Sequence, residues 1–99
     1  MKAERIVLDG TVEALQPAAA FVERWVEEAG LPGKASYGLQ LAVDELVTNI
    51  VTHAYAERGR TGQVIMESEL DPTHLRVVIE DSGEAYDPTA QPPPDDLHK

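Results

Sequence analysis

Apolar residues recur along this 99-residue chain with two different periods, and the change of period separates predicted helices from predicted strands. Between residues 15 and 29 they return at steps of three and four, which is typical of an amphipathic helix ending at Gly30. A second helix is predicted from about residue 34 to residue 56. Its apolar face comprises Leu39, Val43, Leu46, Val47, Ile50, Val51 and Ala54. Residues 4–9 are predicted to form a short strand, and residues 63–70 and 74–81 a hairpin of alternating strands.

The predicted order of elements is therefore strand, helix, helix, strand, strand. Two helices followed by a hairpin favour an α+β fold, a two-layer α/β sandwich with a mostly antiparallel sheet. The strict alternation of strands and helices found in dinucleotide-binding folds is missing. We expect one incomplete domain over residues 1–90, with three strands and an exposed sheet edge. Residues 91–99, which include three consecutive prolines, are expected to be disordered.

Charge and composition narrow the choice of partners. The net charge of −10, from 18 acidic residues against 8 Lys and Arg, argues against nonspecific binding to nucleic acid. No apolar run approaches the roughly 20 residues that span a bilayer, and the first residues lack a signal-like apolar segment. Without cysteine there is no disulfide and no thiolate metal site. We expect a soluble, cytoplasmic protein that binds neither nucleic acid nor a membrane.

The polar face of the second predicted helix carries a carboxylate and a carboxamide one turn apart, Glu45 and Asn49. At about 100° per residue, the two side chains lie about 40° apart. Mg²⁺ prefers oxygen ligands, and the Asn49 carbonyl could supply one while phosphates and water supply the rest. The Glu45 carboxylate could accept a proton from an attacking hydroxyl. Any solvated helix face supplies such pairs, so both interpretations stay open. His53, at the edge of the apolar face, is expected to be a packing residue rather than a metal ligand.

The second hairpin strand ends in a carboxylate whose position is informative. Asp81 shares its strand face with Val77 and Ile79, so it is predicted to point inward. A carboxylate at the edge of a core needs hydrogen-bond donors, and the exocyclic amine of adenine is one such donor. Gly83 would allow a tight turn and the close approach of a flat ring. Asp-Ser-Gly is equally ordinary turn chemistry, in which case Tyr86 would be a packing residue.

Together the two segments resemble the N box and the first glycine box of the GHKL (Bergerat-fold) ATP-binding superfamily. They are most similar to its branch of bacterial anti-sigma-factor serine kinases. The first match covers residues 41–55, and the second, residues 81–88, follows the pattern Asp-x-Gly-x-x-aromatic-Asp-Pro. The resemblance extends over roughly residues 4–90 and includes the order of the predicted elements.

The resemblance implies a site for ATP and Mg²⁺ and a role for each matching residue. Glu45 would be the general base that activates a substrate serine, and Asn49 would hold Mg²⁺. Asp81 would bind the adenine amine, and Gly83 would make room for the ring. The residues implied to line or support the nucleotide pocket are His53, Ala54 and Tyr86.

The resemblance also implies two protein partners in the regulation of transcription. A sigma factor would be sequestered, and an anti-sigma-factor antagonist would be phosphorylated on a serine. Two alternatives remain open. The chain could be a non-catalytic interaction module of the same fold, able to form a homodimer through its sheet edge. It could also be the ATPase domain of a sensor histidine kinase, although no phospho-accepting helix precedes the first strand.

The match to the superfamily ends before its phosphate-binding part. No glycine follows Gly83, so the second glycine-rich box, whose backbone amides cradle the phosphates, has no counterpart in these 99 residues. Residues 91–99 would only begin an ATP lid. We therefore expect a C-terminally truncated domain with negligible kinase activity and weak nucleotide binding.

Overall fold

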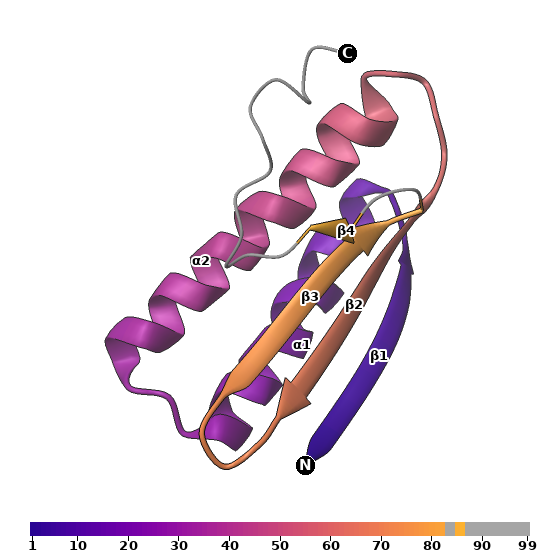
Figure 1. Ribbon diagram of the computed structural model, residues 1–99. Helices are drawn as coiled ribbons and strands as arrows, with labels where there is room; N and C mark the ends of the chain where they lie inside the picture. The colour runs from indigo at the N-terminus through magenta and orange to yellow at the C-terminus, as the bar shows by residue number, and fades with distance from the viewer. Residues whose placement is uncertain (83–84, 87–99) are drawn as a thin grey trace.

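The computed structural model describes residues 1–82 and 85–86, and there two helices lie across one face of an antiparallel sheet (Figure 1). The strands, in their order across the sheet, are β1 (Lys2–Asp9), β2 (Gln63–Leu70), β3 (Leu75–Asp81) and β4 (Ala85–Tyr86). The helical layer consists of the 3₁₀ turn η1 (Val12–Ala14), α1 (Leu15–Ala29), α2 (Gly33–Asn49) and the π-helix η2 (Ile50–Ala56). The predicted α+β fold with its two layers is confirmed.

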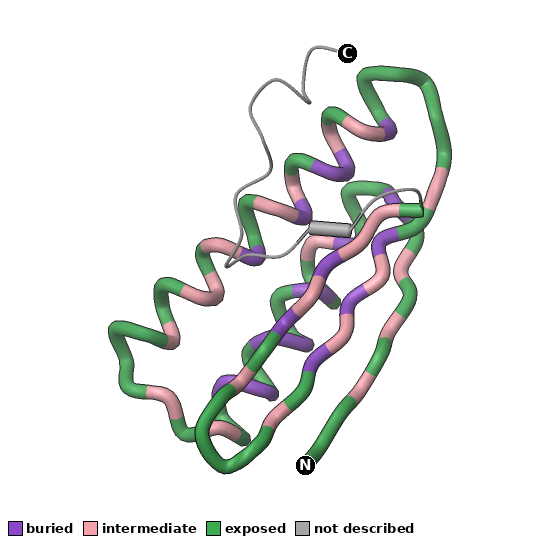
Figure 2. The backbone as a smooth tube through the Cα atoms, viewed as in Figure 1, coloured by how far each residue is buried: buried purple, intermediate pink, exposed green. Residues whose placement is uncertain are grey.

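The register of the sheet fixes which side chains face the helices. Met66 in the middle of β2 lies opposite Ile6 of β1 and Ile79 of β3. Met66 and Ile79 are fully buried, and Figure 2 shows the buried positions of the central strands beneath the buried faces of the helices. Because side chains alternate along a strand, this inner face continues to Asp81, which lies opposite Val64. The predicted hairpin is therefore present, with β3 beginning at Leu75.

The sheet differs from the sequence prediction at both of its edges. β1 starts at Lys2, two residues earlier than the predicted strand. The three predicted strands are present, and the sheet gains a fourth that was not predicted, because β4 pairs with β3 and places Tyr86 opposite Ile79. A strand of two residues is too short to show an alternating pattern, so the sequence gives no signal for it. The predictions for Gly83 and for residues 91–99 lie outside the described residues.

Helix α1 has the predicted bounds, and its end follows from one glycine. Gly30 adopts φ 67°, the left-handed conformation that favours glycine. Its N–H donates to the Glu27 carbonyl at 3.1 Å, and the Leu31 N–H donates to the Val26 carbonyl at 3.3 Å. This is the Schellman pattern, which satisfies the last carbonyls of a helix. Across the described residues, no helix is both long enough and apolar enough to cross a membrane.

The second predicted helix is present, but its last seven residues form the π-helix η2 rather than α-helix. The Glu57 N–H donates to the Thr52 carbonyl at 2.8 Å, five residues back. Such a turn holds more residues than the 3.6 of an α-helix, so each residue advances by less than 100°. Tyr55 is therefore turned into the core, where it is 4% exposed. The side chain of His53 is 62% exposed, so the expectation that it packs at the core edge is wrong.

Edge strand β1 is attached to α1 by a carboxylate on its inner face. The Glu4 carboxylate accepts hydrogen bonds from Arg24 Nη1 at 3.2 Å and from Trp25 Nε1 at 2.9 Å. These donors, Arg24 first and then Trp25, hold the pKa of Glu4 below its ordinary value of 4.5. The interaction satisfies the indole N–H of a buried tryptophan, which would otherwise lose its hydrogen bond with water on folding.

The core contains one polar side chain whose hydrogen bonding is incomplete. Ser68 of β2 is 0% exposed, and its Oγ has no hydrogen-bond partner within the described structure. It occupies the inner face of the sheet, opposite Val77 of β3 and Glu4 of β1. Burying a hydroxyl without a partner costs free energy, so this position lowers the stability of the fold.

We predict that Ser68→Ala raises the free energy of unfolding by about 1 kcal/mol, because it removes an unpaired buried hydroxyl. Urea denaturation followed by circular dichroism measures the change. Ser36→Ala is the matched control, since Ser36 Oγ accepts a hydrogen bond from Gln40 Nε2 at 2.9 Å. The control should not be stabilised. A lower midpoint for Ser68→Ala would contradict the prediction.

Candidate functional site

The carboxylate and carboxamide of the N-box match lie on the outer surface of α2. Glu45 and Asn49 are both exposed. With Asp44 and Thr48 they line a surface depression of about 400 Å³. This part of the helix is regular α-helix, so the predicted one-turn spacing is retained. Within the described part of the chain, neither Glu45 nor Asn49 has a hydrogen-bond or ion-pair partner, which leaves both available to a ligand.

The donor set in this depression limits the metal that it could hold. Its lining side chains offer only carboxylate, carboxamide and hydroxyl groups, which suit a hard cation such as Mg²⁺. Among the described residues, no group of three or more His, Cys, Asp or Glu is placed to hold a metal ion. The residues therefore fit Mg²⁺ that arrives with phosphate and water ligands. They do not fit a cation bound by protein side chains alone.

The aspartate of the glycine-box match lies at the end of β3, on the sheet face that the helices cover. Asp81 is half-buried, opposite the fully buried Val64. It is not among the residues that line the depression at Glu45. Tyr86 is placed by its backbone, in β4 beside Ile79. The side chain of Tyr86 and all of Gly83 fall outside the described residues.

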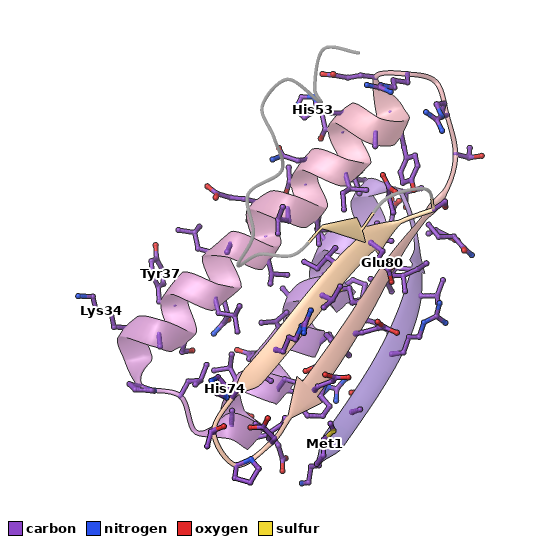
Figure 3. The ribbon with its side chains drawn as sticks, in the orientation of Figure 1. Met1, Lys34, Tyr37, His53, His74 and Glu80 are labelled. Carbon is purple, nitrogen blue, oxygen red and sulfur yellow. The ribbon has the colours of Figure 1, made fainter. Side chains whose placement is uncertain are left out.

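The two remaining residues implied for the pocket lie next to each other in η2 but differ in exposure. Ala54 is half-buried and packs against the hydrophobic core. His53 points outward, as Figure 3 shows, and its Nδ1 lies 2.8 Å from Glu57 Oε1. Ala54 is therefore part of the packed interior, whereas the His53 side chain lies at the surface.

A tyrosine that sequence reasoning missed connects the helix end to three strand ends. A Cβ at Gly10 would lie 2.4 Å from Tyr55 Cδ2, and a Cβ at Gly62 would lie 2.5 Å from Tyr55 Cε1. The Gly10 N–H donates to the Gly62 carbonyl at 2.8 Å, so the two glycines also bond to each other. The sequence signal for this contact was the pair Gly10 and Gly62. Gly10 follows the predicted strand 4–9, and Gly62 precedes the predicted strand 63–70.

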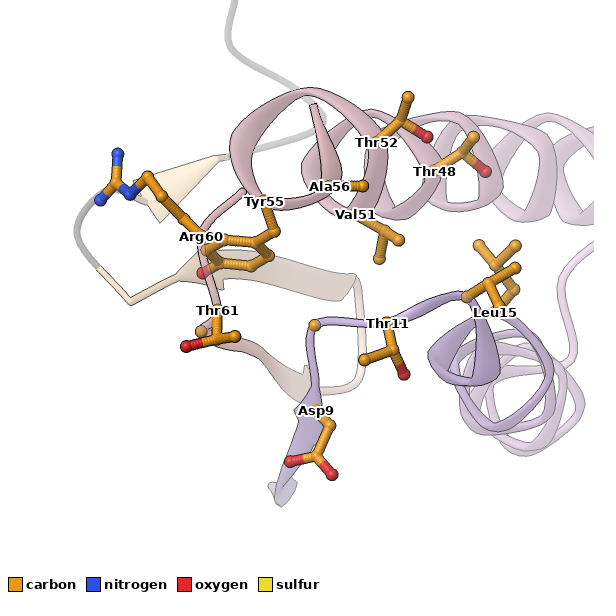
Figure 4. A pocket seen from close by; sticks show the side chains of 13 residues that line it. Asp9, Thr11, Leu15, Thr48, Val51, Thr52, Tyr55, Ala56, Arg60 and Thr61 are labelled. Atoms are coloured by element: carbon orange, nitrogen blue, oxygen red, sulfur yellow. The ribbon is translucent and has the colours of Figure 1, made fainter. Parts of the chain in front are cut away.

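The ring of Tyr55 also forms one wall of a larger pocket, of about 680 Å³, between the start of α1 and η2 (Figure 4). Leu15 and Val51 supply apolar walls, and Asp9 and Arg60 contribute the charged groups. The hydroxyl-bearing residues that line it are Thr11, Thr48, Thr52, Tyr55 and Thr61. Thr48 lines both this pocket and the depression at Glu45, so the two adjoin on α2. No motif in the sequence indicated this pocket.

Two helices covering one face of an antiparallel sheet are consistent with an α+β ATPase-type domain. The family described as histidine kinase-like ATPase domain matches residues 8–98, and the chain belongs to this family. The resemblance to the GHKL superfamily is thereby confirmed.

Similarity to individual proteins is more local. The chain is 38% identical over 48 residues to the serine-protein kinase RsbW of Staphylococcus epidermidis. The same identity over the same length holds for RsbW of Staphylococcus aureus strains MRSA252 and Newman. The matched segment covers 48% of this chain and 30% of each relative's length.

We predict that Gly62→Ala lowers the free energy of unfolding by about 1–3 kcal/mol, because its methyl group overlaps the fixed ring of Tyr55. Thermal and urea unfolding measure the loss. Gly38→Ala in α2 is the control, since a Cβ there meets nothing within 4 Å. Alanine should be neutral or favourable at that helical position. Equal stabilities of the two variants would show that the Tyr55 ring is not held in close contact with Gly62.

Proposed function

We propose that this chain is the ATP-binding part of a protein-serine kinase that phosphorylates an anti-sigma-factor antagonist and sequesters a sigma factor. Membership of the ATPase family and the similarity to serine-protein kinases support the proposal. The observation that carries it is the exposure and burial of the residues that match the two boxes. Glu45 and Asn49 are exposed without partners in the described structure, and Asp81 lies half-buried on the inner sheet face.

At the phosphate end, α2 supplies the reacting groups. Asn49 offers its carbonyl oxygen to Mg²⁺, and the metal, when bound, would neutralise charge on the phosphates. Glu45 would accept the proton of the substrate serine as the serine oxygen bonds to the terminal phosphorus of ATP, while the bond from that phosphorus to the bridging oxygen breaks and ADP leaves. The depression around these residues contains no basic side chain among those that line it, so the cation must balance the phosphate charge there.

At the base end, the proposal assigns recognition to the end of β3. The Asp81 carboxylate accepts a hydrogen bond from the adenine amine, and Gly83 allows the ring to approach. Ala54, which is half-buried on η2, packs against the base or the residues beneath it. The proposal also assigns Tyr86 and His53 to this end, on the resemblance alone. An adenine amine would give the Asp81 carboxylate a strong, charge-assisted hydrogen bond.

We predict that the chain binds ADP more tightly than inosine diphosphate, whose base has a carbonyl in place of the amine. Asp81→Asn should reduce ADP affinity by about tenfold or more, the effect of losing a hydrogen bond to a charged group. Isothermal titration calorimetry measures both ligands. Asp44→Asn, an exposed residue of the Glu45 depression, is the matched control and should keep the preference for ADP.

The same titrations test the metal and the proposal as a whole. ADP should bind more tightly in Mg²⁺ than in EDTA, and Asn49→Ala should remove most of that difference. Absence of any heat with ADP at millimolar concentration would overturn the proposed nucleotide site. That result would favour a non-catalytic interaction module.

We predict that Glu45→Gln leaves the ADP affinity of this chain unchanged, because only the proton acceptor is lost. In a longer chain that also carries a second glycine-rich box, and so can transfer phosphate, the same substitution should lower serine phosphorylation by about a hundredfold or more. Transfer of labelled phosphate from ATP to a purified antagonist protein measures the rate. Glu23→Gln, at an exposed glutamate of α1 outside the depression, is the matched control. Equal transfer by wild type and Glu45→Gln would contradict the role of Glu45 as base.

A further inference from the structure

The geometry points to Tyr55 as a positioning residue for base recognition, whose hydroxyl holds the end of β3 where Asp81 can meet the adenine amine. The inference depends on the proposed function, because it takes Asp81 to be the residue that binds the base. Tyr55 itself need not touch the nucleotide. Its role would be to set the position of the backbone that carries Asp81.

The hydroxyl of Tyr55 is fully engaged at the point where the β2–β3 ladder stops. It donates to the Gln63 carbonyl at 2.9 Å and accepts the Ser82 N–H at 2.9 Å. A hydroxyl has one hydrogen to donate and can accept two, so both bonds form at once. Ser82 is the residue directly after Asp81, and its backbone is thus tied to the helix end.

These bonds replace one missing backbone pair between β2 and β3. The last paired residues of the ladder are Val64 and Asp81, so the next pair in register would be Gln63 and Ser82. In their place, the Tyr55 hydroxyl bridges the Ser82 N–H to the Gln63 carbonyl. The Gln63 N–H donates to Ser82 Oγ at 2.9 Å. Side chains therefore set how far the end of β3 stands from β2.

The bridging hydroxyl cannot move freely, because the ring that carries it is held on both sides. Gly10 and Gly62 approach the ring so closely that neither has room for a Cβ. The hydrogen bond from the Gly10 N–H to the Gly62 carbonyl keeps the two glycines together. A rigid ring transmits its position to the hydroxyl, and through Ser82 to Asp81. Preorganised groups bind a ligand with a smaller entropic cost.

Tyr55→Phe tests this inference, because it keeps the ring between the glycines and removes only the hydroxyl. The ratio of ADP affinity to inosine diphosphate affinity should fall by about fivefold or more, because a displaced Asp81 no longer accepts the hydrogen bond of the adenine amine. Affinity for inosine diphosphate should change by less than about twofold. Amide exchange at Ser82, followed by NMR, should accelerate by about tenfold. Tyr37→Phe, at a residue that is 70% exposed, should leave all three values unchanged.

The outcomes separate this inference from the function on which it depends. If wild-type protein shows no preference for ADP, the assignment of Asp81 fails and the inference fails with it. If wild type prefers ADP and Tyr55→Phe keeps the full preference, only the positioning role is overturned. An equal loss of affinity for ADP and for inosine diphosphate would indicate that Tyr55 has only a structural role. That result would also overturn the positioning role. Should Tyr55→Phe not fold, rapid exchange of the Ser82 amide in wild-type protein would still refute the inference.

Discussion

The close approach of two glycines to the ring of Tyr55 is the constraint on which this end of the molecule depends. The ring fills the space between Gly10, just after β1, and Gly62, just before β2. Its hydroxyl extends the contact to Ser82, just after β3. Three strand ends thus converge on one side chain from the helical layer. The ring of Tyr55 therefore limits how closely the end of the helical layer approaches the ends of β1 and β2.

The ring reaches this position only because the helix changes its winding. In η2 each residue advances by a smaller angle around the helix axis than in α2. The accumulated difference in rotation turns Tyr55 inward and His53 outward. π-helical turns are uncommon, because their hydrogen bonds form five residues apart in place of the more favourable α-helical spacing. Here the burial of an aromatic ring, together with one hydrogen bond that its hydroxyl donates and one that it accepts, offsets that cost.

Local patterns predicted the parts of the fold that local physics determines. The period of α1, the glycine at its end and the alternation of β2 and β3 were sufficient for those elements. Strand parity alone placed Asp81 on the inner face. The π-helical phase could not be predicted, because it depends on contacts between Tyr55 and glycines elsewhere in the chain. That phase is also why the packing role expected of His53 was wrong, while β4 was too short to leave a pattern.

The two parts of the proposed nucleotide site consequently differ in how they are held. The end at Asp81 is joined to the core by a bridged ladder and a fixed ring, so its geometry exists before any ligand arrives. The end at Glu45 and Asn49 is an exposed stretch of regular helix, whose polar groups have no partners within the described residues. A rigid base end can select a ligand by shape and hydrogen bonding. An open phosphate end instead relies on charge, and a metal ion with its waters can adapt to it. Under the proposed function, selectivity would come from the strand end and chemistry from the helix.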